Sequence, residues 1–112
     1  MPTPHRPSLA VRRALRKLGL DIREARRRRG LPMSLVADRA FTSRATLQRV
    51  ESGNAATGIG VYAAVLHALG LLDNLAGVAD PARDPVGQSL ASRWAPTRIR
   101  LRMTTPPRSE DG

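Results

Sequence analysis

Residues 41–53 read "FTSRATLQRVESG", and this stretch decides the fold of the chain. If it is helical, Leu47 and Val50 share one face with the preceding Ala40, because residues three, four or seven positions apart lie on the same side of a helix. Long hydrogen-bonding side chains and one methyl group occupy the other face: Arg44, Gln48, Arg49 and Ala45. Such a face is either an ordinary solvated surface or a surface that recognises a ligand.

The composition indicates a basic globular protein. The chain has 112 residues, of which 41% are hydrophobic, so we expect one domain with tails. Its formal charge is +10, and residues 1–30 hold ten basic and two acidic residues, which is +8 of that total. Of the nineteen basic residues all but Lys17 are Arg, which suits bidentate contacts to phosphates and base edges, although a GC-rich genome also raises the Arg content. A basic segment on an otherwise near-neutral chain indicates a polyanionic partner, either nucleic acid or an acidic membrane surface.

Several classes of protein are disfavoured. No apolar run approaches the roughly 18 residues that span a bilayer, and the N-terminal stretch lacks the apolar core of a secretory signal. We therefore expect a cytoplasmic, nucleoid-associated protein with no membrane partner. The absence of Cys excludes disulfides and thiolate metal sites. Because His5 and His67 are the only histidines, the acidic residues lack metal-ligand spacing and no Gly-rich phosphate loop follows a strand, we expect no enzyme and no cofactor.

Hydrophobic periodicity predicts mainly helices. The first helix ends at Gly30, and its apolar stripe steps by four and three residues through Val11, Leu15, Leu18, Ile22 and Ala25. Gly19 weakens the middle of this helix by about 1 kcal/mol, so its second half is better supported. Further short helices are predicted over residues 33–40, from Thr42 or Ser43 to Gly53, over 57–70 and over 72–79.

The C-terminal part gives a weaker pattern. Residues 86–94 predict a weak helix, and "TRIRLRM" at 97–103 alternates basic with apolar residues, which favours a short strand that needs a partner surface. The alternative is a basic arm that orders on DNA. The resulting organisation is a flexible basic leader at 1–10, a domain at 11–80, an extension at 81–103 and a disordered tail at 104–112.

Five short helices, two of them separated by a tight turn, indicate a helix-turn-helix arrangement. Residues 21–53, "DIREARRRRGLPMSLVADRAFTSRATLQRVESG", resemble the lambda-repressor-like (XRE or Cro/CI) superfamily, and the likeness continues without a gap to Leu69. It implies an all-α, five-helix domain with a C-terminal extension. It also implies a buried ion pair between Arg26 and Glu51.

This chain departs from the superfamily pattern at several positions. Phe41 occupies the turn position where Gly is usual, so the bend must form without a permissive residue or take another shape. Thr42 replaces a common Ile or Val, and Met33 stands where many members have a Gln that contacts phosphate. The loop at 54–60 also lacks the Lys or Arg that often binds phosphate.

Residues 35–100 resemble a narrower group, the HipB-like antitoxins and regulators. Its members share a "GxYAxVLxALGL" helix, matched at residues 60–71, an "LADP" segment and a basic C-terminal ending. The resemblance implies a homodimer that represses its own operon and binds a HipA-like Ser/Thr kinase toxin.

These inferences assign roles to particular residues. Arg44, Ala45, Gln48 and Arg49 are expected to read the bases of double-stranded DNA, since Arg pairs with guanine, Gln with adenine and a methyl group with thymine. Phosphate contacts are expected from Ser43, Ser34, Met33, Arg27 and Thr57. Dimer or partner contacts are expected from Leu72, Leu75, Val78, Ile99 and Leu101.

Three alternatives remain open at this level. Arg27, Arg28 and Arg29 could be a solvated, generally attractive surface instead of defined phosphate contacts. The protein could be an antitoxin or adaptor that mainly binds another protein, with DNA binding secondary. RNA binding is disfavoured, because the chain has only three aromatic residues on which bases could stack.

Overall fold

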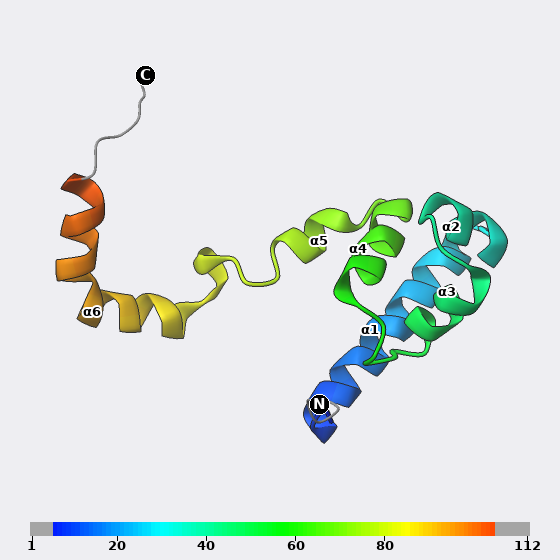
Figure 1. Cartoon of the computed structure of the whole chain (residues 1–112), viewed down its shortest axis with the longest axis horizontal. Coiled ribbons are helices and arrows are strands. Elements are labelled where there is room, and N and C mark those ends of the chain that lie inside the picture. Colours follow the sequence, from blue (N-terminus) through cyan, green and yellow to red (C-terminus); the bar gives the residue numbers. More distant parts are fainter. Residues whose placement is uncertain (1–5, 105–112) are drawn as a thin grey trace, which may run out of the picture. The chain divides into compact units, whose positions relative to one another are not determined.

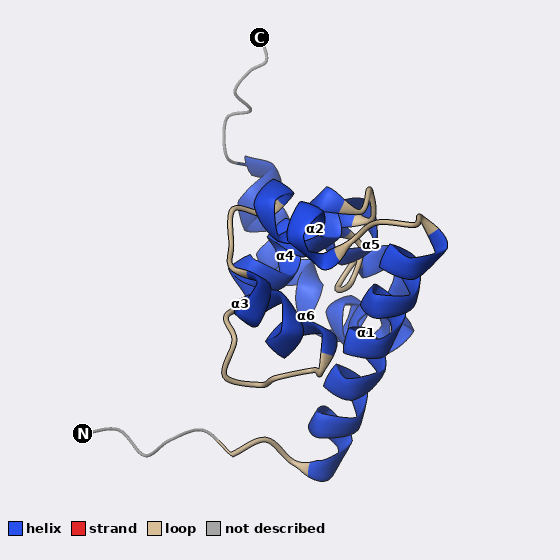
Figure 2. Ribbon diagram, turned by 90° about the vertical axis from the view of Figure 1, so that its right-hand side faces the viewer, coloured by secondary structure: helices blue, strands red, loops and turns tan. Residues whose placement is uncertain are grey.

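The computed structural model describes the backbone of residues 6–104 and the side chains of residues 6–94, and this part of the chain is all-α (Figures 1 and 2). The helices, with one 3-10 turn, are α1 (Leu9–Arg28), α2 (Met33–Arg39), α3 (Arg44–Glu51), α4 (Ile59–Ala68), α5 (Leu72–Ala76), η1 (Pro81–Arg83) and α6 (Pro85–Thr104). They form two compact units, Met1–Leu75 and Ala76–Gly112. No helix in the described part is both long and apolar enough to cross a membrane.

Helix α1 begins two residues earlier than the periodicity predicts. Ser8 caps it, because the Ser8 Oγ accepts a hydrogen bond of 3.3 Å from the Val11 amide. The helix then continues through Gly19 to Arg28, and Gly30 follows in the left-handed region with a φ of 63°. Its apolar side reaches the core through Ile22 and Ala25, which are both 1% exposed.

Gly19 lies where α1 and the end of α3 touch backbone to backbone. A Cβ at Gly19 would lie 2.6 Å from both the Glu51 carbonyl oxygen and the Gly53 nitrogen. A Cβ at Gly53 would in turn lie 2.5 Å from the Leu15 carbonyl oxygen, and Gly53 also has a φ of 75°. The predicted weak point of α1 is therefore the place where a side chain would keep the two helices apart.

The turn between α2 and α3 forms despite Phe41. Phe41 adopts a φ of 55°, in the left-handed region that Gly usually occupies, and its side chain is 97% exposed. Two hydrogen bonds close the end of α2: the Phe41 amide donates to the Asp38 carbonyl at 3.1 Å, and the Thr42 amide donates to the Ala37 carbonyl at 2.9 Å. The turn therefore has the left-handed conformation that Gly would adopt, with Phe41 in place of Gly.

The core of the Met1–Leu75 unit lies among α1, α2, α3 and α4. Small side chains at Ala37 and Ala40 let α2 approach its neighbours closely. The buried apolar residues are Ile22, Ala25, Val36, Ala37, Ala40, Leu47, Val50, Tyr62, Val65, Leu66 and Leu69. Tyr62 also closes the loop before α4, because its hydroxyl donates to the Asn54 carbonyl at 2.8 Å.

The Ala76–Gly112 unit consists of η1 and the long helix α6. Asp80 and Asp84 cap these elements, each accepting a backbone hydrogen bond of 2.9 Å, from Ala82 and Gly87 respectively. Since α6 extends to Thr104, the strand predicted at 97–103 is wrong, and among residues 6–104 no strand is present (Figure 2). A lone strand leaves its backbone groups without partners, whereas a helix satisfies them within the same segment.

Candidate nucleic-acid interface

Helix α3 has one buried and one exposed side. Leu47 and Val50 are fully buried, at 0% exposure. The other side is exposed and carries the four side chains expected to read bases: Arg44, Ala45, Gln48 and Arg49. The helix is thus held by its apolar side and presents guanidinium, amide and methyl groups on the opposite one.

The start of α3 is fixed by a local hydrogen-bond network around Ser43. Its Oγ accepts from the Thr46 amide and donates to the Thr46 Oγ1, both at 3.0 Å. The Thr46 Oγ1 also accepts a weaker bond from Arg49 Nη1 at 3.4 Å, which orients that guanidinium along the helix. The hydroxyl of Ser43, expected to contact phosphate, is therefore already used as an N-cap.

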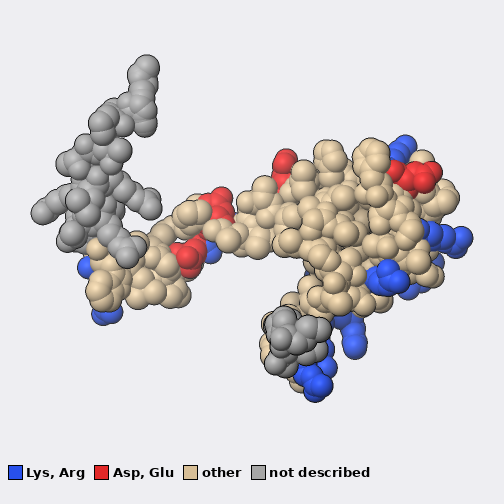
Figure 3. Space-filling model, in the orientation of Figure 1, with Lys and Arg blue, Asp and Glu red and all other residues tan. Residues whose placement is uncertain are grey.

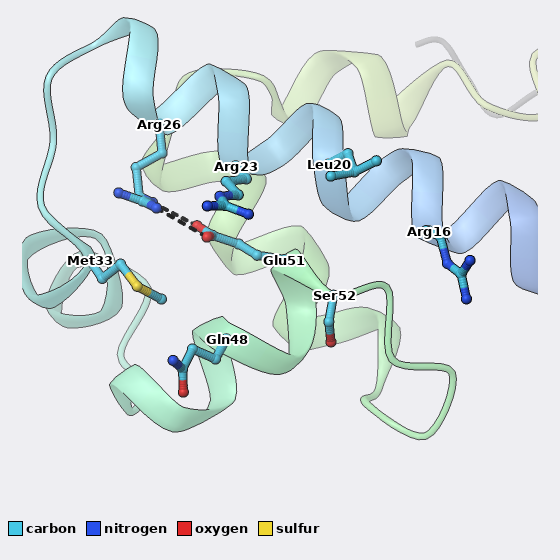
Figure 4. A pocket seen from close by; sticks show the side chains of 8 residues that line it. All are labelled: Arg16, Leu20, Arg23, Arg26, Met33, Gln48, Glu51 and Ser52. Atoms are coloured by element: carbon cyan, nitrogen blue, oxygen red, sulfur yellow. Dashed lines mark hydrogen bonds and ion pairs between the residues drawn. The ribbon is translucent and has the colours of Figure 1, made fainter.

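Arg26 and Glu51 form a bidentate pair that joins α1 to α3 (Figure 4). Arg26 Nε donates to Glu51 Oε2 at 2.7 Å, and Nη2 donates to Oε1 at 3.1 Å. A third bond runs from Arg26 Nη1 to the Leu31 carbonyl at 3.1 Å, so the same guanidinium also holds the loop before α2. The hydrogen bonds to Glu51 raise the pKa of Arg26 above its ordinary value, although burial acts to lower it.

An open hollow of about 470 Å³ lies between α1, the start of α2 and α3 (Figure 4). The Arg26–Glu51 pair lies at it, and the other side chains that line it are Arg16, Leu20, Arg23, Met33, Gln48 and Ser52. Arg16 and Arg23 are exposed, and no carboxylate of residues 6–94 lies within 4.0 Å of them. The hollow therefore adds two unpaired cations of α1 to the face that contains Gln48.

The residues expected to contact phosphate are in different situations. Met33 is half-buried against the core and forms an apolar wall of the hollow, while Ser34 is exposed at the start of α2. Arg27 is exposed, with Nη1 3.7 Å from Glu24 Oε2. Thr57 donates both its amide, at 2.9 Å, and its hydroxyl, at 3.2 Å, to the Asn54 Oδ1. The donors of Thr57 are thus used inside the loop, which weakens its case as a phosphate contact.

The residues expected at a dimer or partner surface differ in exposure. Leu75 packs against the core of its own unit, Leu72 is half-buried and Val78 is 73% exposed. Ile99 and Leu101 lie outside the residues whose side chains are described.

Two features of these surfaces were missed from sequence. The first is the apolar row on α6 formed by Val86, Leu90 and Trp94, which are 68%, 46% and 72% exposed. The second is the pair Arg16 and Arg23 at the hollow. Spacings of four and seven residues could have revealed both, because a helix was predicted over each segment.

Comparison with known proteins adds no assignment. The chain matches no protein-family model, no curated protein and no solved structure at a significant level. Function is therefore argued from the side chains and their geometry.

Proposed function

We propose that this chain is a sequence-specific regulator that binds double-stranded DNA through a lambda-repressor-like helix-turn-helix. In this proposal α2 and α3 are the two helices of the motif, and α3 enters the major groove. The observation that carries it is the exposed face of α3, where two Arg, one Gln and one Ala side chain stand together on a helix whose other side is buried.

The chemistry of that face suits base edges. The major groove is about 12 Å wide and admits one helix. Arg44 and Arg49 can each donate two hydrogen bonds to a guanine, Gln48 can pair with an adenine, and the methyl group of Ala45 can contact a thymine methyl. The Arg26–Glu51 pair supports this arrangement, because it fixes α3 to α1 without using any residue of the exposed face.

We further propose a homodimer on a near-palindromic operator, with the two reading helices about 34 Å apart. The resemblance to HipB-like regulators supports repression of the protein's own operon. Such a repressor acts on the nucleoid in the cytoplasm. The exposed apolar row of α6, with Val78 nearby in sequence, supplies candidate dimer contacts.

Selection of duplexes from a random pool, followed by titration, tests the DNA-binding proposal. Arg44→Ala or Arg49→Ala should weaken the selected duplex by about 1–3 kcal/mol and relax preference at one or two positions, with a much smaller effect on random DNA. Arg28→Ala is the control: Arg28 lies two positions from Arg26 and so on the side of α1 away from α3. Equal loss on selected and random DNA would show that these residues contact phosphate only. Failure to enrich any sequence would overturn the proposal.

The exposed row of α6 favours a second candidate, a protein-binding antitoxin or adaptor in which DNA binding is secondary. The resemblance to HipB-like antitoxins suggests a HipA-like Ser/Thr kinase toxin as partner. If a neighbouring gene encodes such a kinase, the two proteins should co-purify, and Leu90→Gln with Trp94→Gln should abolish the complex, while the Met1–Leu75 unit should still bind a DNA half-site. An unchanged complex would exclude α6 as the contact.

A further inference from the structure

Helix α1 carries three arginines on one side, here called the arginine stripe: Arg12, Arg16 and Arg23. Their spacings of four and seven residues place them along one face of the helix. Arg16 and Arg23 line the hollow that also contains Gln48, and Arg16 lines a second open hollow of about 440 Å³ together with Arg12. Arg16 lines both hollows, so the stripe runs along α1 from the hollow that contains Gln48.

The arginine stripe has no anionic partner among the described side chains. All three residues are exposed, and no carboxylate of residues 6–94 lies within 4.0 Å of any of them. The two acidic residues of α1 lie beside other cations instead, at 2.6 Å from Lys17 and 3.7 Å from Arg27. Arg12 and Arg16 are also like charges four positions apart on the helix, and Arg12 lies in the first turn, where the helix dipole favours anions. An external anion would relieve this repulsion.

The charge pattern of the Met1–Leu75 unit agrees with this reading. On the face shown in Figure 3, Lys and Arg atoms lie toward the beginning of α1 and also at the end of the unit that contains α2 and α3. The Asp and Glu atoms of the unit on the same face lie toward α5 and α2, away from the beginning of α1. On this face the beginning of α1 thus shows cations without neighbouring carboxylates.

The stripe is held in a fixed position relative to α3. The backbones of α1 and the α3 end are in direct contact at Gly19 and Gly53, with no room for a Cβ at either position. The Arg26–Glu51 pair joins the same two helices two turns further along α1. A contact made by Arg12 or Arg16 is therefore placed at a set distance from the residues expected to read bases.

We propose that the arginine stripe binds phosphates of the DNA backbone beside the bases that α3 reads, so that α1 lengthens the contact along the duplex. This inference rests on the proposed DNA-binding function. The eleven helical rises from Arg12 to Arg23 span about 16 Å. Phosphates of one strand follow each other every 3.4 Å of duplex axis, so the stripe matches a run of about five. Each guanidinium fork can bind two phosphate oxygens.

The test compares two variants that each remove two positive charges. Arg12→Gln with Arg16→Gln alters the stripe, whereas Lys17→Gln with Arg28→Gln alters the other side of α1. Binding to a selected 30-base-pair duplex is titrated over a range of salt concentrations. Losing two phosphate contacts should reduce the slope of log K against log salt by about 1.8, which corresponds to about 60-fold weaker binding at 0.1 M salt. The control should change the slope by less than half as much.

Trimming the ends of the duplex gives an independent readout. Wild-type protein and the control should lose affinity when flanking base pairs are removed, while the stripe variant should bind long and trimmed duplexes equally. The inference is wrong if both variants weaken DNA binding alike. Binding to anionic phospholipid vesicles is measured as well, and the inference is also wrong if the stripe variant loses vesicle binding but keeps its DNA binding. If the wild-type protein binds no duplex at all, the proposed function itself fails, which is a different outcome. Circular dichroism checks that all variants remain helical.

Discussion

Arg26 and Glu51 depend on each other, because both side chains are largely withdrawn from water, at 12% and 7% exposure. Glu51→Ala leaves a guanidinium with one carbonyl partner in place of three hydrogen bonds, and should reduce the free energy of unfolding by about 3–5 kcal/mol. Removing both Arg26 and Glu51 should reduce the free energy of unfolding by less than removing only one of them. Denaturant unfolding of the four proteins in a double-mutant cycle measures this coupling. Small, additive effects would show that the pair behaves like one at the surface.

Tyr62 gives the structure a dependence on alkaline pH. Burial raises the pKa of its hydroxyl above the ordinary value of 10.0, and the hydroxyl donates to the Asn54 carbonyl, a bond that the tyrosinate cannot make. The folded state therefore holds the Tyr62 proton more tightly than the unfolded chain. This contribution to stability is fully present below pH 10.0 and is lost as pH rises through the folded-state pKa.

Tyr62 is the only Tyr in the chain, so tyrosinate absorbance reports on this residue alone. The midpoint of its titration should lie above 10.0 in the native protein and return to the ordinary value in denaturant. Tyr62→Phe should remove the loss of stability that begins at that pH. A native midpoint equal to the denatured one would mean that the hydroxyl is solvated.

The buried and exposed sides of α3 could be predicted from residue spacing, whereas the hydrogen-bond partners of individual polar groups could not. Thr57 and Ser43 illustrate the difference: each was assigned to phosphate, yet their hydroxyls bind Asn54 and Thr46 in local turns and caps. Such short-range hydrogen bonds compete with contacts to a ligand, and a sequence does not show which of the two the hydroxyl makes. The Arg26–Glu51 pair was implied only by a family resemblance, because the two residues are 25 positions apart.

At the scale of elements, the close contact between α1 and α3 requires Gly at position 19, although Gly has a low helix propensity. Gly19→Ala adds a methyl group 2.6 Å from two backbone atoms of the α3 end. The gain of about 1 kcal/mol in propensity should be outweighed by the displacement of packed backbone, for a net loss of about 1–3 kcal/mol in unfolding free energy. Gly60→Ala is a matched control in α4, since a Cβ there meets nothing within 4 Å. This control should leave the stability unchanged or raise it. Thermal unfolding of both variants and the wild-type protein measures the difference.

Element boundaries were predictable where periodicity and Gly stops agreed, as for α3 and α4. The segment at 97–103 shows the limit, because its alternation of Arg with apolar residues is local information. Whether a strand forms depends on a neighbouring strand, and none is present among residues 6–104. Phe41 shows a related limit, since the hydrogen bonds that end α2 hold an L-residue at a φ of 55° that its type disfavours.

At the scale of the whole molecule, the division into two units separates folding from association. Among residues 6–94, all eleven buried apolar residues lie in Met1–Leu75, from Ile22 to Leu69. The Ala76–Gly112 unit has no buried apolar residue among its described side chains, and its exposed row of Val86, Leu90 and Trp94 lacks a partner in the described part of its unit. A helix with such a row gains stability only when another surface covers it. We therefore expect the first unit to fold alone and the second to mediate dimer formation.

Ending the chain after Ala79 tests this division. The shortened protein should keep nearly the full melting temperature of the intact one, because it retains α1 to α5 and the whole core. In sedimentation it should be a monomer, whereas the intact protein should have twice its chain mass of 12.1 kDa. Leu90→Gln with Trp94→Gln in the intact chain should give the same monomer without any deletion. On DNA, the monomer should protect a single half-site and bind more weakly, because the second half-site no longer adds its contacts. If the shortened protein still dimerises, the interface lies on the Met1–Leu75 unit, and the exposed row of α6 must serve a different partner.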